Sequence, residues 1–131
     1  MLLVKTKIGP SEISGIGLFA DEFIPKGTPT WKFMPGFDLK ISREKLAALS
    51  EPGRSQFLNY AYLNIRTGNY ILCFDDARFF NHADEANCIS TDPTTGDEEG
   101  IDIAARDIRL GEELTNNYRE FDDDFNKKMG E

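Results

Sequence analysis

Two glycines that bracket one apolar residue, Gly15 and Gly17 around Ile16, are the first residues in the chain whose spacing suggests chemistry. Glycine has no side chain and tolerates positive φ, so a turn of this kind lets the backbone approach a ligand closely. The complete Gly-x-Gly-x-x-Gly pattern of a dinucleotide site is absent, and the residues that follow predict a strand and not a helix. On its own, the segment fits a ligand-binding loop and a plain hairpin turn equally well.

A second polar segment holds the only histidine of the chain, His82, which directly follows Asn81 and lies four residues after Arg78. Considered alone, a histidine beside an asparagine is more often a hydrogen-bonded core residue than a catalyst. One histidine and two cysteines are too few for a four-ligand zinc site or a disulfide framework. We therefore expect no metal, and we expect Cys73 and Cys88 to be buried free thiols.

A third segment runs from Gly111 through Glu113 to Tyr118. Together with the two earlier segments and with Asn87-Cys88, it resembles the signature of SET-domain protein-lysine methyltransferases, in the order and at about the distances that this family shows. The resemblance spans nearly the whole chain and implies a single SET domain over residues 1–131. The implied fold is mainly β and β-clip-like, with small curved sheets, a C-terminal pseudoknot, one short insert helix and a C-terminal helix.

The resemblance also implies S-adenosyl-L-methionine as the cofactor. The glycine loop would contact it through main-chain groups, and His82 would offer mainly its backbone to the adenine. The residues expected to bind it are Gly15, Ile16, Gly17, Arg78, Asn81, His82, Tyr118 and Phe121. Ala83 stands where the family usually has Ser, and Ala86 where it usually has Pro. These departures affect a hydroxyl hydrogen bond and the stiffness of the loop.

Tyr118 closes the Glu-Leu-Thr-x-x-Tyr segment, and by resemblance it lies beside the reacting methyl group. Methyl transfer from a sulfonium to an amine is an in-line displacement, so the site must align the donor carbon and the nitrogen at about 3 Å. A free lysine with a pKa near 10.4 is only about 0.04% neutral at pH 7, so the site must lower that pKa. A tyrosine suits this task because its ring lines an apolar channel and its hydroxyl orients the nitrogen.

A second tyrosine is expected in the same channel. Tyr60 and Tyr62 lie on one face of a predicted strand, and either would serve, while a core role is equally open for each. We assign Tyr60 to catalysis with Tyr118. Asn116 occupies a position where many family members carry Phe or Tyr, and that position helps decide how many methyl groups are added, so product multiplicity stays open.

The family often carries a cysteine-rich zinc segment after the terminal tyrosine, and this chain lacks it. Phe121 and Phe125 are four residues apart, which places them on one face of a predicted helix that begins near Arg119. This helix would close over the cofactor and the lysine channel, or a second subunit of a homodimer would supply that wall.

Short β-rich runs separated by turn residues dominate the rest of the chain. The predicted strands are Leu2–Ile8, Gly17–Ala20, Pro29–Met34, Tyr60–Ile65, Tyr70–Phe74, Ile101–Ala105 and Glu113–Asn117. A helix is predicted over Ser42–Leu49 with Ser42 as its N-cap, and Pro52-Gly53 predicts a turn. A faint internal repeat, Ala20-x-x-x-Ile24-x-x-Gly27 against Ala104-x-x-x-Ile108-x-x-Gly111, suggests two similar hairpins.

The charge balance restricts the partners. A net charge of −8 argues against nucleic acid, because phosphate binding needs a basic face. The acidic runs at 97–99 and 122–124 would either steer a lysine-rich partner toward a cleft or simply form a solvated surface. No apolar run approaches the roughly 20 residues of a membrane span, and no leader pattern is present, so a cytoplasmic location is expected by default. A nuclear or nucleoid-associated location stays open.

The sequence therefore predicts a protein-lysine N-methyltransferase that uses S-adenosyl-L-methionine and acts on a basic, lysine-containing protein or peptide, such as a histone, a histone-like protein or another basic protein. The main alternative is a SET-like module that binds the cofactor or a basic peptide without turnover, for which Ala83, Ala86 and Asn116 are the hints. A third hypothesis is an acidic interaction domain whose motifs are only structural.

Overall fold

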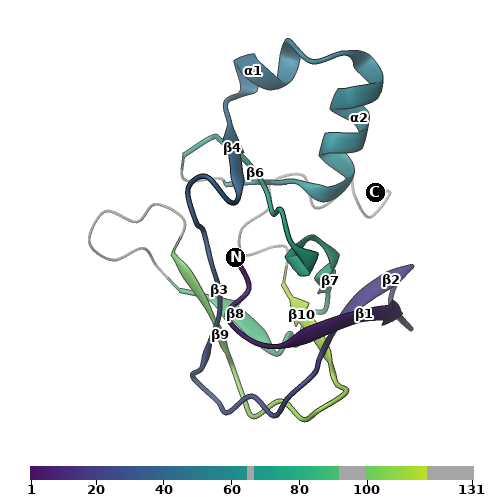
Figure 1. Cartoon of the computed structure of the whole chain (residues 1–131), viewed down its shortest axis with the longest axis vertical. Coiled ribbons are helices and arrows are strands. Elements are labelled where there is room, and N and C mark those ends of the chain that lie inside the picture. The colour runs from purple at the N-terminus through teal and green to yellow at the C-terminus, as the bar shows by residue number, and fades with distance from the viewer. Residues whose placement is uncertain (65–66, 92–99, 118–131) are drawn as a thin grey trace.

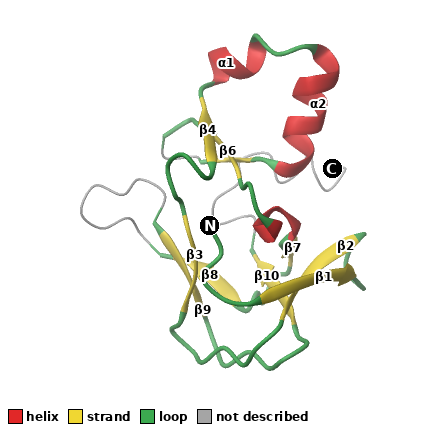
Figure 2. Cartoon of the chain, viewed as in Figure 1, coloured by secondary structure: helices red, strands yellow, loops and turns green. Residues whose placement is uncertain are grey.

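The computed structural model describes residues 1–64, 67–91 and 100–117 (Figure 1). Within these ranges, ten strands form three small sheets, and two short α-helices lie together at one end of the molecule (Figure 2). The mainly β architecture predicted from the sequence is confirmed. No helix in the described part of the chain is long and apolar enough to cross a membrane.

The four-stranded sheet brings both ends of the described chain together. Its order is β1 (Thr6–Pro10), β2 (Ile16–Ala20), β10 (Glu113–Asn116) and β7 (Asn81–His82). β10 runs antiparallel to β2 and parallel to β7. The three segments that carry the sequence signature therefore lie in one sheet, with β10 at its centre between the other two.

The second sheet has the order β3-β9-β8 and packs beside the first. Its strands are β3 (Pro29–Lys32), β9 (Ile101–Ala104) and β8 (Cys88–Ser90), and both pairings are antiparallel. The sheet contributes Trp31, Cys88 and Ala104 to the main core, and along β9 buried residues alternate with partly exposed ones. The core also receives Leu18 from β2 and Leu114 from β10.

The third sheet carries the helices (Figure 2). It has the order β4-β6-β5, with β4 at Leu39–Ile41, β6 at Tyr70–Leu72 and β5 at Tyr62–Leu63. Between β4 and β5 the chain forms α1 (Arg43–Ala47) and α2 (Glu51–Tyr60). A separate small core, which includes Leu46, Phe57 and Leu63, fixes the helices on this sheet.

Two predictions fail in this region. Pro52-Gly53 is not a turn but part of the first turn of α2, where proline is tolerated because its missing N–H would have had no partner. Ser50 caps the helix by accepting a hydrogen bond from the Gly53 N–H at 3.1 Å. The predicted strand Tyr60–Ile65 is also wrong at its start, because α2 ends at Tyr60 and β5 covers Tyr62–Leu63. The insert thus contains two helices and not one.

The predicted helix over Ser42–Leu49 is confirmed as α1. Ser42 is its N-cap, and the Ser42 hydroxyl accepts from the Lys45 N–H at 3.2 Å. The helix predicted to begin near Arg119 lies outside the described residues, as do Tyr118 and Phe121. Beyond β6, a 3₁₀ helix, η1 (Asp76–Phe79), leads directly into β7.

The internal repeat has a structural counterpart, although it does not form two hairpins. Its two copies pair with each other: the N–H of Ile24 donates to the carbonyl of Ile108 at 2.8 Å, and the reverse bond has the same length. The Gly27 N–H donates to the Ala104 carbonyl, and the Gly111 N–H donates to the Ala20 carbonyl, each at 2.8 Å. The two copies therefore cross as equivalent partners and join the first sheet to the second.

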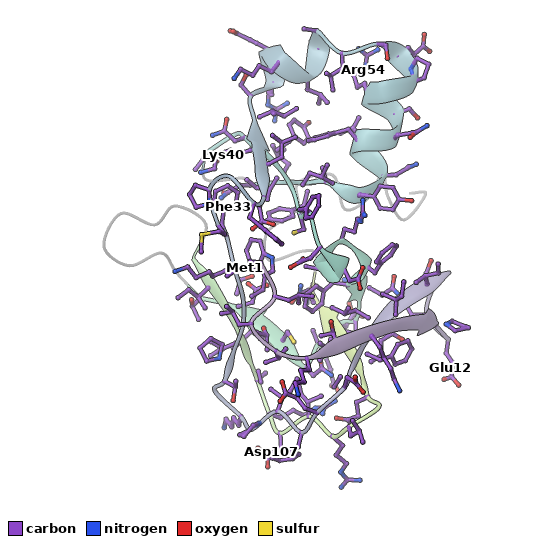
Figure 3. The ribbon with its side chains drawn as sticks, viewed as in Figure 1. Met1, Glu12, Phe33, Lys40, Arg54 and Asp107 are labelled. Carbon is purple, nitrogen blue, oxygen red and sulfur yellow. The ribbon has the colours of Figure 1, made fainter. Side chains whose placement is uncertain are left out.

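The N-terminal residue is partly buried and lies between the sheet that carries the helices and the other two sheets (Figure 3). The Met1 ammonium group forms an ion pair with the buried Asp38 carboxylate at 2.7 Å. Asp38 additionally accepts from the Met34 N–H at 2.9 Å. Leu2 continues this attachment through a β-bridge with Trp31, so the first residues of the chain hold the base of the insert against the second sheet.

Candidate functional site

The candidate site lies where the glycine loop, β7 and β10 meet (Figure 1). The loop between β1 and β2 is closed by a hydrogen bond from the Ser11 N–H to the Gly15 carbonyl at 2.9 Å. Gly15 has φ +46°, and the space where its side chain would lie is open. An open, side-chain-free turn of this kind leaves its backbone accessible to a ligand.

Gly17 is a glycine for a different reason. Its φ is ordinary, but a Cβ at this position would overlap with Oε2 of Glu113 and would lie 3.0 Å from the Ser11 Cβ. Both contacts are closer than van der Waals contact allows. The glycine at position 17 therefore makes room for the Glu113 side chain, which reaches across from β10.

Asn81 fastens β7 to the same loop. Its amide nitrogen lies 2.9 Å from Oε2 of Glu113, and 3.1 Å from both the Ser11 Oγ and the Ser14 carbonyl oxygen. The nitrogen carries two hydrogens, so it serves at most two of these acceptors at a time. The side-chain nitrogen of Asn81 is thus already engaged within the protein.

His82 is positioned by its own loop. Its Nε2 lies 3.0 Å from Oδ1 of Asp84, and the interaction is an ion pair only when the imidazole is protonated. Beside it, the Ala83 N–H donates to the carbonyl of Asn116 at 3.1 Å. Because the strands also pair at His82 and Asn116, the backbone of this turn is held firmly against the end of β10.

Asn87 supports the central strand from the other side. It is buried, with 2% of its surface exposed. Its Oδ1 accepts from the Thr115 N–H at 2.9 Å, and its Nδ2 donates to the Glu113 carbonyl at 2.8 Å. The side-chain amide therefore pairs with β10 as a peptide group of a neighbouring strand would. This arrangement gives the Asn-Cys part of the motif a structural role.

The two cysteines are buried free thiols, as predicted. Burial raises the pKa of the Cys88 thiol to about 12, although the nearby Thr30 hydroxyl acts in the opposite direction. Burial also raises the pKa of Cys73, and the nearby Asp38 carboxylate adds to that effect. Thiols with raised pKa values are poor nucleophiles. In the described part of the chain, no group of three His, Cys, Asp or Glu side chains is placed to hold a metal ion.

Tyr60 and Arg78 lie side by side, although not by the route the sequence predicted. Tyr60 is the last residue of α2, and the Arg78 guanidinium of η1 lies 5.4 Å from the centre of its ring. The same guanidinium lies 5.7 Å from the Phe79 ring. These cation–π contacts dock the end of the insert on the segment that leads into β7. Tyr62 instead packs edge-on against Trp31, with ring centres 6.5 Å apart.

Asn116 is the last residue of β10, two positions before Tyr118. It is 5% exposed, and its Oδ1 has no hydrogen-bond partner among the described residues. A buried acceptor of this kind is costly unless a ligand, a water molecule or a further part of the chain satisfies it.

Sequence reasoning grouped the segments that the structure places in one sheet, but it assigned no role to Ser11 or Glu113. Glu113 was part of the quoted motif, yet its side chain had no assigned role. Because side chains alternate along a strand, Glu113 and the core residue Leu114 point to opposite faces of β10. Only the pairing of β10 with β2 shows that the face with Glu113 lies beside the glycine loop.

Comparisons with known proteins agree with this arrangement. Residues 15–119 match the family model of the SET domain. Among solved structures, a Plasmodium falciparum protein, PFL0690c, provisionally assigned as a histone methyltransferase, aligns with a TM-score of 0.57 at 20% identity. The alignment covers 89% of this chain and 95% of that one. The search of curated proteins found no match.

Polycomb Repressive Complex 2 of Chaetomium thermophilum, in a structure bound to GSK126, aligns with a TM-score of 0.70 at 25% identity over 97% of this chain. The same complex in an autoinhibited conformation bound to S-adenosylmethionine gives a TM-score of 0.69 at 24% identity, again over 97% of this chain. The present chain spans only 17% and 16% of those two longer chains.

The fold and the site define a SET domain. Because the family model covers more than half of its length, the chain belongs to the SET-domain family, whose members include protein-lysine methyltransferases. The resemblance inferred from the sequence is confirmed.

Proposed function

We propose that this protein is a single-domain, S-adenosyl-L-methionine-dependent protein-lysine N-methyltransferase. One observation carries the proposal: the open glycine turn, the Asn81-His82 turn and the strand that leads to Tyr118 are neighbours in one sheet, although they are far apart in the sequence. A purely structural interaction domain would have no need for an accessible glycine turn at this junction.

The residues around the glycine turn fit the cofactor. The open space beside Gly15 and the exposed position of Ile16 allow a ligand to reach the main chain there. Gly15, Ile16, Gly17 and the backbone of His82 would hold the cofactor together with Asn81, which would contact it through atoms other than its engaged side-chain nitrogen. Arg78 and Phe121 would lie beside it. When bound, S-adenosyl-L-methionine supplies an electrophilic methyl group on a sulfonium.

The remaining work falls to residues that prepare the lysine. The hydroxyl of Tyr118 would orient the ε-nitrogen, and its ring would exclude water from the channel. Tyr60, 45% exposed at the end of α2, would form a second wall of the channel, and its hydroxyl would help to orient the ε-nitrogen. An apolar channel favours the neutral amine over the ammonium, so it lowers the lysine pKa and makes the nitrogen lone pair available.

The substrate we propose is a basic, lysine-containing protein or peptide, because the net charge of −8 attracts such partners and repels nucleic acid. A histone, a histone-like protein or another basic protein would satisfy this requirement. We propose a cytoplasmic location by default, with a nuclear or nucleoid-associated one as the alternative, and either a monomer or a homodimer as the active form.

A second candidate is a SET-like module that binds the cofactor or a basic peptide without turnover. Asn116 favours it, because a buried amide acceptor without a described partner stands where the family often has an aromatic ring. A polar group there would hold a charged ammonium and thereby oppose the neutral amine that the reaction needs.

Transfer of labelled methyl groups from S-adenosyl-L-methionine to lysine-rich proteins tests the two candidates. The substrate panel would contain core histones, a histone-like nucleoid protein and ribosomal proteins. We expect label on lysine with the natural chain and at least a hundredfold less with Tyr118→Phe, since the positioning of a nucleophile contributes at least that much. Tyr60→Phe and Tyr62→Phe form a matched pair, of which only the first should slow transfer.

The binding of S-adenosyl-L-methionine, measured by calorimetry in parallel, separates the outcomes. Cofactor binding without label on any substrate would favour the binding module. A chain that neither binds nor transfers would refute both candidates and leave the acidic interaction domain.

A further inference from the structure

We propose that Glu113 is a positioning residue for the cofactor-binding loop, and that its carboxylate clamps this loop to β7 and β10. The inference rests on the proposed function, because it concerns the loop that would hold S-adenosyl-L-methionine. The evidence is the set of hydrogen bonds that converge on its two oxygens.

Three segments meet at this carboxylate. Ser11 Oγ lies 2.8 Å from Oε1 and 2.9 Å from Oε2, and the Asn81 amide nitrogen lies 2.9 Å from Oε2. Hydrogen bonds to an ionised carboxylate are about twice as strong as neutral ones. Glu113 itself stands at the start of β10, opposite Phe19 of β2. One side chain therefore connects the loop, β7 and the central strand.

Ser11 transmits this connection to the loop backbone. Its hydroxyl has a single hydrogen, which it shares between the two carboxylate oxygens, so its lone pairs are directed away from Glu113. Those lone pairs accept from the Ile13 N–H at 2.9 Å and lie 3.3 Å from the Ser14 nitrogen. The carboxylate thus fixes the orientation of the hydroxyl, and the hydroxyl fixes the backbone of residues 13 and 14.

The lack of a side chain at position 17 is the complement of this clamp. A Cβ at Gly17 would overlap with Oε2 and also lie 2.9 Å from Cδ of Glu113. The end of a free glutamate would swing aside, but this one is held by hydrogen bonds from two directions. Gly17→Ala must therefore displace the carboxylate and break the clamp, which makes positions 17 and 113 energetically coupled.

The clamp also links the binding of the cofactor to the position of the proposed catalytic tyrosine. β10 begins at Glu113 and ends at Asn116, two residues before Tyr118. The strand that fixes the cofactor loop at one end therefore leads to the proposed catalytic tyrosine at the other. Loss of the clamp should affect the binding of the cofactor first, because Asn87 still supports β10 from its other side.

A double-mutant cycle with Gly17→Ala, Glu113→Ala and the combined variant tests the proposal, with Glu112→Ala as the matched control. Glu112 is the neighbouring glutamate, and it bonds to the Arg109 N–H and to Arg106 on the surface. Calorimetry would measure the affinities for S-adenosyl-L-methionine and S-adenosyl-L-homocysteine, and thermal unfolding would be followed on the same samples.

We expect Glu113→Ala to weaken both ligands about tenfold, which corresponds to the net loss of one or two hydrogen bonds. With labelled-methyl transfer, the KM for the cofactor should rise to the same extent while kcat at saturation changes less than about twofold, which a general loss of folded protein would not produce. Gly17→Ala alone should weaken the binding of both ligands about tenfold. In the Glu113→Ala background, the same substitution should weaken binding less than about threefold. Glu112→Ala should bind both ligands as the natural chain does.

Additive effects of the two substitutions would overturn the inference, because they would show that the glycine and the carboxylate act independently. A Glu113→Ala variant that weakens only the sulfonium ligand would also overturn it in favour of a simple charge effect. A natural chain that binds neither ligand would refute the proposed function and, with it, this role of Glu113. Ligand binding together with additive effects would refute the role of Glu113 alone.

Discussion

The side chain of Asn87 offers the sharpest test of how this site is held together. Asn87→Ala removes both hydrogen bonds to β10, which takes away the Asn87 partner of the part-buried Glu113 carbonyl and of the buried Thr115 N–H. Each such group costs about 1–3 kcal/mol. We therefore expect Asn87→Ala to lower the free energy of unfolding by about 3 kcal/mol. For 131 residues this lowers the unfolding midpoint by about 10 °C, with an unfolding entropy of about 2.1 cal/mol/K per residue.

Asn87→Asp adds a dependence on pH. When protonated, the introduced carboxyl has the shape of the amide and can make both hydrogen bonds. When ionised, it places a charged oxygen against the Glu113 carbonyl, where the amide nitrogen now lies at 2.8 Å. The folded state thus raises the pKa of this carboxyl above the unfolded value of about 3.9 and binds more protons than the unfolded chain. The stability relative to the natural chain must therefore fall as pH rises, by up to about 1.4 kcal/mol per unit.

The assay is urea unfolding followed by circular dichroism between pH 5.5 and 8, where a chain with a pI of about 4.7 keeps its negative charge. Near pH 6, Asn87→Asp should lower the free energy of unfolding as much as Asn87→Ala does, since about two pH units above 3.9 correspond to about 3 kcal/mol. At higher pH, Asn87→Asp should lower it more than Asn87→Ala does. Asn59→Asp, on the exposed side of α2, is the control and should change little with pH. A loss in Asn87→Asp that is the same at every pH would refute the claim that the side-chain amide replaces a strand.

Two further predictions concern the core and the crossing segments. Cys73 and Cys88 should not react with a thiol reagent at pH 8 until the chain is unfolded. Because burial raises both pKa values, the folded state should also lose stability as pH rises above about 9, toward about 12 for Cys88. Alkaline titration followed by circular dichroism would detect this, and rapid labelling of the native protein would contradict it. Gly27→Ala and Gly111→Ala should each lower the free energy of unfolding, measured by thermal unfolding, by about 1–2 kcal/mol. The reason is the positive φ of both residues, +87° for Gly27 and +89° for Gly111, since the space around each is open. Clearly unequal costs would show that the two crossing copies are not equivalent.

The elements predicted from the sequence are those that local chemistry specifies. The cap at Ser42 predicted α1, and short β-rich runs between turn residues predicted β2, β3, β9 and β10 within one or two residues. α2 was missed because Pro52-Gly53 normally marks a turn, and only the cap by Ser50 makes the pair compatible with a helix. β7 has two residues and β8 has three, too few for any period to be visible.

For the site, too, the sequence predicted local features but not the long-range contacts. The sequence indicated that Gly15, Gly17 and Asn81 act together, but it did not indicate what joins them. The contact between Glu113 and Gly17 depends on the register of β10 against β2, which is set by the packing of Leu18 and Leu114 in the core. Similarly, Tyr60 was placed on a strand because aromatic and β-branched residues follow it, whereas its real partner, Arg78, comes from another segment.

The crossing of the two repeat copies determines the order in which the chain can assemble. Ile24 meets Ile108, and β2 and β3 pair with β10 and β9. Beyond the β1-β2 pair and the Leu2–Trp31 bridge, the early strands therefore lack their remaining partners until residues 101–116 are available. Closing such long loops costs entropy before any contact is made, and folds of high contact order form slowly. During synthesis the first thirty residues must therefore wait with Leu18 and Ile24 uncovered, which is a hazard for aggregation. The glycine loop and its clamp arise in the same late event, so a truncated chain without β10 would lack the fold and the site together.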